Sequence, residues 1–113
     1  MSDLPWPSSF SLDPRKVVHY LLDEFHLEGG PKARFFLRFG FEAAAPFDLA
    51  SALIAHPTWD TFVTKTVSER GDVKLAFEGP ITAPDGRTPH IRTVWRLDEN
   101  GAARFVTAVP LTR

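Results

Sequence analysis

The spacing of the hydrophobic side chains changes near Pro57, and this change restricts the fold more than any other feature of the chain. Before Pro57 they recur at helical intervals, as Val17 and Leu21 do, which is typical of an amphipathic helix. After Pro57 they alternate with polar residues, as Val73 and Leu75 do, which is typical of half-buried strands. The sequence therefore predicts an α+β domain with N-terminal helices packed on one face of a four-stranded antiparallel sheet.

The element boundaries follow from capping and turn residues. Asp13 is a favoured N-cap and Pro14 suits the first helical position, because its missing N–H would have no intrahelical partner there. We expect residues 1–12 to be an extended lead-in and residues 13–113 to form a single α+β domain. The predicted helices span 13–30, 31–40 and 46–56, and the predicted strands span 59–68, 72–78, 90–98 and 102–110.

The C-terminal half contains the clearest local signal, an Asn100-Gly101 pair between two alternating runs. This dipeptide is typical of a tight β-hairpin, since both residues tolerate positive φ. The same apolar stripes that define the elements also identify the core. The predicted core residues are Phe35, Phe36, Leu53, Trp95 and Phe105.

Composition narrows the possible chemistry. The chain has no cysteine, so we expect no disulfide, no thiolate nucleophile and no Cys-based metal site. Its four histidines stand at no ligand-like spacing, which predicts neither a metal site nor a cofactor. No stretch approaches the ~20 apolar residues of a membrane span, so we expect a cytoplasmic protein. The formal net charge of −1 provides no global field for nucleic acid, so such a role requires a local basic patch.

Three sets of motifs form a recognisable combination. They are GGPKARFF at 29–36, then EGP at 78–80 with PDGRTP at 84–89, then RTVW at 92–95 with RFVTAVPL at 104–111. Together they resemble an uncharacterised family of small bacterial domains over nearly the whole chain. That family is similar in turn to bacterial toxin and nuclease domains, among them barnase-like, colicin-like and RelE-like ribonucleases. The resemblance implies active residues at a helix end and on the exposed face of the sheet.

Candidates for RNA cleavage are present in the sequence. Metal-independent cleavage needs a base, an acid and cations directed at the charge on phosphorus. His26 lies near the end of the first predicted helix and titrates near neutral pH, whereas Lys32 begins the next helix, where an anion is favoured. The predicted catalytic residues are His26, Lys32, Arg92, Arg104 and Thr107, and the predicted substrate-binding residues are Arg96, Thr93 and His90.

Ordinary structural roles also fit these residues. His26 can interact with helix carbonyls, and the strand arginines can pair with Glu78 and the acids of the turns. Where the resemblance to those ribonucleases implies an aromatic residue before the final proline, this chain has Val109. If that aromatic stacks on a base, its absence weakens catalysis or RNA binding.

Three functional classes therefore stay open. The first is a ribonuclease-like or RNA-handling domain of a bacterial toxin-related family, with its activity intact or lost. The second is a non-catalytic protein-binding module, such as an immunity or accessory protein that pairs with the product of a neighbouring gene. The third is a structural homo-oligomer formed through an open sheet edge, and the sequence leaves the oligomeric state open.

Overall fold

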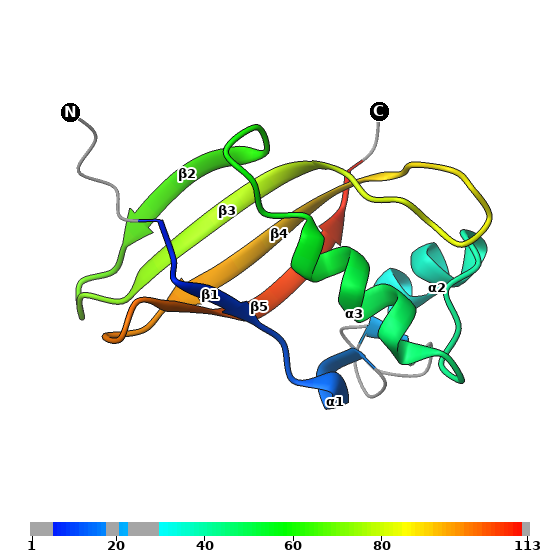
Figure 1. Ribbon diagram of the computed structural model, residues 1–113, viewed down its shortest axis with the longest axis horizontal. Helices are drawn as coiled ribbons and strands as arrows, with labels where there is room; N and C mark the ends of the chain where they lie inside the picture. Colours follow the sequence, from blue (N-terminus) through cyan, green and yellow to red (C-terminus); the bar gives the residue numbers. More distant parts are fainter. Residues whose placement is uncertain (1–5, 18–20, 23–29, 112–113) are drawn as a thin grey trace.

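The structure is a computed structural model, and it describes residues 6–17, 21–22 and 30–111. Figure 1 shows a twisted sheet with the helices gathered on one side. The second and third predicted helices are confirmed as α2 and α3. Of the first predicted helix, only α1 and a few following residues are described. His26 lies outside the described residues. The elements are β1 (Ser9–Ser11), α1 (Pro14–Lys16), α2 (Gly30–Arg38), α3 (Pro46–Ala55), β2 (Phe62–Val67), β3 (Val73–Pro80), β4 (His90–Leu97) and β5 (Ala102–Pro110).

The sheet contains one strand more than predicted. Strands β2 to β5 form the expected antiparallel arrangement, and β1 adds a fifth strand in the order β1-β5-β4-β3-β2. Because β1 pairs with β5 in parallel, with Phe10 opposite Ala103, the prediction of a purely antiparallel four-stranded sheet is wrong. A three-residue strand is too short to show an alternating pattern, and its partner lies about 90 residues away in the chain.

The predicted N-cap and the predicted hairpin are both present, although only Gly101 of the Asn100-Gly101 pair has positive φ. The Asp13 side chain accepts a hydrogen bond of 2.9 Å from the Arg15 N–H and so caps α1. In the β4–β5 hairpin, Gly101 has a φ of +84°, which a residue with a side chain rarely adopts. Asp98 accepts hydrogen bonds from the backbone of this turn, and the Ala102 N–H in particular holds the pKa of its carboxyl below the usual range.

The core lies between the helices and one face of the sheet. Phe36 of α2, Leu53 of α3 and Trp95 of β4 have no exposed surface, and Phe105 is 6% exposed, which confirms these four core predictions. Phe35 is only partly buried and packs at the margin against Phe39, with ring centroids 5.0 Å apart. Further fully buried side chains among the described residues include Val17, Leu21, Phe41, Leu49, Leu75, Phe77, Ile91 and Thr93.

A polar network is buried within this apolar core. His56, just after α3, contacts Thr93 Oγ1 through Nδ1 at 2.8 Å and the Gly79 carbonyl through Nε2 at 3.1 Å. Since a carbonyl only accepts, Nε2 carries the proton and Nδ1 accepts from the Thr93 hydroxyl. The Thr93 oxygen accepts in turn from the Trp95 Nε1–H at 2.9 Å. Every group is satisfied with a neutral imidazole.

We expect this network to make stability depend on pH. Burial lowers the pKa of His56 from its usual 6.5, so the unfolded chain binds a proton more readily than the folded one. The free energy of unfolding should therefore fall as the pH drops below about 6.5. Urea unfolding at several pH values would measure it, with His56→Gln as the control that lacks this component. If the free energy of unfolding depended on pH identically in both proteins, the account of His56 as a buried, neutral imidazole would be wrong.

Candidate functional site

The sheet face that points away from the core carries the predicted strand arginines. Residues directly opposite each other in paired strands share a face. Arg96 lies opposite Arg104, and Thr107 lies opposite Val94. Arg92, Val94 and Arg96 alternate with buried residues of β4, so they point away from the core together. We call this surface the arginine face: Lys74 and Glu78 of β3, Arg92, Val94 and Arg96 of β4, and Arg104, Thr107 and Val109 of β5.

Each strand arginine has a carboxylate partner. Arg92 pairs with Glu78 at 2.6 Å, Arg96 with Asp72 at 2.8 Å and Arg104 with Asp98 at 3.4 Å. The Arg104 side chain is 72% exposed and that of Arg96 is 58% exposed, so water competes for these charges. Exposed pairs of this kind contribute roughly 0–1 kcal/mol, and another anion can replace the carboxylate at little cost.

Lys32 and Thr107 meet across the edge of the sheet. Lys32 belongs to the first turn of α2, and its Nζ donates a hydrogen bond of 2.7 Å to Thr107 Oγ1. Thr107 lies opposite Val94, so it stands between Arg92 and Arg104 on the arginine face. The contact therefore brings the ammonium group of an α2 residue to this face. Lys16 also reaches β5, where its Nζ donates to the Val106 carbonyl at 2.9 Å.

The turn end of the arginine face is hollowed. Arg70, Arg96 and Arg104 line a hollow of about 760 Å³ together with acidic residues of the two turns. Arg70 and Lys74 were not predicted as site residues: Arg70 lies in a turn, and Lys74 was marked only by its alternation with Val73 and Leu75 in the predicted strand. The face and its hollow together hold six cations (Lys32, Arg70, Lys74, Arg92, Arg96 and Arg104) and four acids (Asp72, Glu78, Asp98 and Glu99).

Two predicted substrate-binding residues lie apart from this cluster. Thr93 is fully buried and belongs to the His56 network, so the expectation of its direct contact with a substrate does not fit the structure. His90 is exposed at the start of β4, beside a hollow of about 260 Å³ that Phe35 and Phe39 also line. The face therefore unites Lys32, Thr107 and the three arginines.

The His, Asp and Glu side chains in the described part of the chain include no group of three or more placed to hold a metal ion. None of its helices has the length and apolar character needed to cross a membrane.

Comparison with known proteins supports the fold and names a family. A chain of a contact-dependent growth inhibition toxin–immunity protein complex from Klebsiella pneumoniae 342 has a similar fold, with a TM-score of 0.72 and 17% identity. The alignment covers 90% of this chain and 93% of that one. Among curated protein sequences, none matches. The model of a domain of unknown function, DUF6883, matches residues 4–112, and the chain belongs to this family.

Proposed function

We propose that the arginine face binds RNA and that the chain is a ribonuclease-like or RNA-handling domain of a toxin-related bacterial family. The observation that carries the proposal is the Lys32–Thr107 hydrogen bond of 2.7 Å, which adds a cation from α2 to a face that already bears Arg92 and Arg104. The similar Klebsiella structure is a toxin–immunity protein complex, and this supports a toxin-related setting. So does the resemblance of the motifs to a family of small bacterial domains that is itself similar to ribonuclease toxins.

The proposed chemistry follows from the donors on this face. Guanidinium groups bind phosphate through paired N–H donors, and the exposed guanidinium groups of Arg96 and Arg104 can exchange their carboxylate partners for it. Lys32 and the Thr107 hydroxyl add a charge and a donor between the arginines. For cleavage, His26 would take the proton of the 2′-hydroxyl as the 2′-oxygen bonds to phosphorus, and would then give that proton to the 5′-oxygen as its bond to phosphorus breaks.

The binding test is a salt titration with a short single-stranded RNA. Affinity should fall steeply with salt, and Lys32→Ala should flatten the plot of log K against log salt by about 0.7 if it removes one phosphate contact. Lys65→Ala is the matched control, because Lys65 is exposed on β2 and its pairing with the core residue Leu75 keeps it off the arginine face. Equal slopes for the two variants would contradict the proposal.

Cleavage is tested separately from binding. If the RNA is cut, His26→Ala should abolish cutting while binding persists. If RNA binds uncut, the domain has kept binding and lost catalysis, and Val109→Tyr then tests whether an aromatic residue strengthens binding. Val109 is 37% exposed on the arginine face, where a ring can stack on a base.

A second candidate function is a non-catalytic immunity or accessory module that binds a protein. The observation that favours it is the pairing of all three strand arginines with carboxylates in a chain whose net charge is −1. This function predicts no affinity for RNA at any ionic strength. The same salt titration therefore separates the two candidates.

A further inference from the structure

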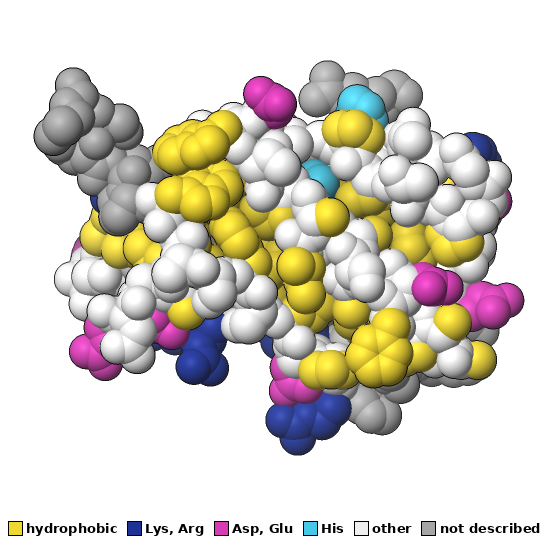
Figure 2. Space-filling view, viewed as in Figure 1, with side chains coloured by type: hydrophobic (Ala, Val, Ile, Leu, Met, Phe, Trp, Pro, Cys, Tyr) yellow, Lys and Arg dark blue, Asp and Glu magenta, His cyan; other side chains and the backbone are white. Residues whose placement is uncertain are grey.

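The outer side of α3 is an acidic and apolar surface on the other side of the molecule from the arginine face. Between Arg38 and Lys65 the sequence contains no lysine and no arginine, whereas it contains Glu42, Asp48 and Asp60, all three exposed. Figure 2 shows hydrophobic side chains exposed on this side, with acidic side chains near them. This stretch of the chain therefore contributes only acidic side chains to the surface.

Large hydrophobic side chains project from the same segment. Phe47 is 70% exposed and Ile54 is 42% exposed, and seven residues of separation place them on one side of α3. Trp59 follows the helix, is 57% exposed, and stacks on Trp6 with ring centroids 4.3 Å apart. Exposed aromatic and aliphatic side chains are enriched on surfaces that bind another protein.

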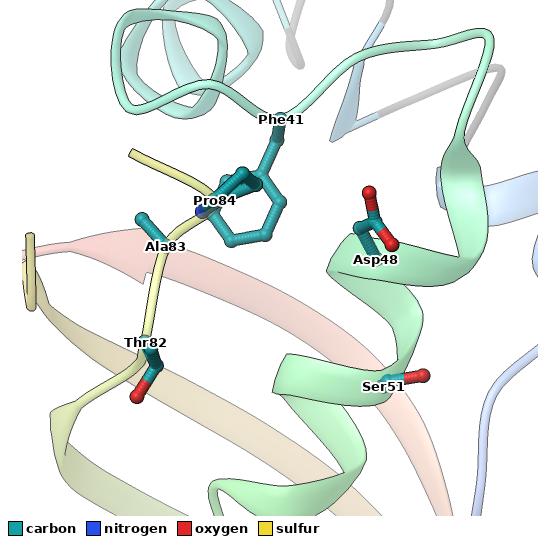
Figure 3. Close-up of a pocket in the computed structure, with 6 residues that line it drawn as sticks. All are labelled: Phe41, Asp48, Ser51, Thr82, Ala83 and Pro84. Carbon is teal, nitrogen blue, oxygen red and sulfur yellow. The ribbon is translucent and has the colours of Figure 1, made fainter. Parts of the chain in front are cut away.

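A pocket beside α3 supplies a specific contact. Figure 3 shows Asp48 and Ser51, from successive turns of α3, on one side, and Phe41 with Pro84 of the β3–β4 loop on the other. Its volume is about 290 Å³, at the lower limit for small-molecule sites, which begin at roughly 300 Å³. No described lysine or arginine forms an ion pair with Asp48.

We infer that this surface docks a protein partner whose contacting segment presents a lysine or arginine flanked by apolar side chains. The aliphatic stem of the basic residue lies against Pro84, and its charged end meets the Asp48 carboxylate. The flanking apolar residues cover Phe47 and Ile54. Charge complementarity selects a basic partner, because the segment offers three acids and no cation. The inference is independent of RNA binding, since it uses none of the arginine-face residues.

The test is an NMR titration of the ¹⁵N-labelled full chain with the acetylated peptide amide Ala-Leu-Lys-Leu-Ala. We expect chemical-shift changes at Asp48, Ser51 and Thr82, and much smaller changes with the peptide in which norleucine replaces lysine. Asp48→Asn should weaken binding about two- to fivefold, the range of an exposed ion pair, and Phe47→Ser should weaken it further. Glu69→Gln, an exposed acid in the β2–β3 turn, is the matched control and should leave binding unchanged.

Three results would overturn the inference. Equal binding of the norleucine peptide would show that charge plays no part. Shifts confined to other surfaces, or none at all, would show that the α3 surface does not accept such a segment. An equal loss of peptide affinity in Asp48→Asn and Glu69→Gln would show that the effect comes from the net charge of the protein and not from a contact with Asp48. Since RNA is absent from this experiment, its failure leaves the proposed function untouched, and the reverse holds as well.

Discussion

Trp95→Ala is expected to lower the free energy of unfolding by about 3–5 kcal/mol. Trp95 has no exposed surface, and its ring meets those of Phe10 and Phe105 edge-on, each at a centroid distance of 5.3 Å. Truncation therefore leaves a cavity where β1, β4 and β5 meet. Urea unfolding measures the loss as a lower midpoint.

The neighbouring residue provides the control for Trp95. Val94 points to the arginine face and is only partly buried, so Val94→Ala should cost much less. Equal midpoints for the two variants would contradict the greater burial of Trp95, and a lower midpoint for Val94→Ala would mean that the strand faces have been assigned the wrong way round.

Thr93→Val is expected to cost about 2–4 kcal/mol although it preserves the shape of the side chain. The Thr93 hydroxyl contacts both His56 Nδ1 and Trp95 Nε1–H, and valine leaves each of these buried groups without a partner. The measurement is again the unfolding midpoint. The matched control is Thr107→Val, because Thr107 is only partly buried on the arginine face and its loss should affect binding far more than stability. An unchanged unfolding midpoint in Thr93→Val would contradict the hydrogen-bond network.

Much of the fold could be predicted because its signals are local. The change from helical to alternating spacing placed α2, α3 and the strands β2 to β5 within a few residues. The Asn100-Gly101 pair located the hairpin whose Gly101 has positive φ. The strand β1 escaped prediction because its pairing with β5 is long-range, parallel and only three residues long.

The candidate site was predictable only in part. Arg92 and Arg96 are four apart in one strand, and this even spacing already placed them on the same face. The same alternation places Thr93 on the side of the strand that bears Ile91 and Trp95, so the sequence already indicated that Thr93 is buried. The contact between Lys32 and Thr107 could not be predicted from the sequence, since it joins residues 75 positions apart and depends on how α2 packs against β5.

The measurement that most directly tests the central claim is NMR mapping of a short single-stranded RNA on the ¹⁵N-labelled chain. If the arginine face binds RNA, the largest chemical-shift changes will occur at Arg92, Val94, Arg104 and Thr107, and added salt will reverse them. Changes centred on α3 and Trp59, or no changes at low salt, would contradict the claim and favour the protein-binding module.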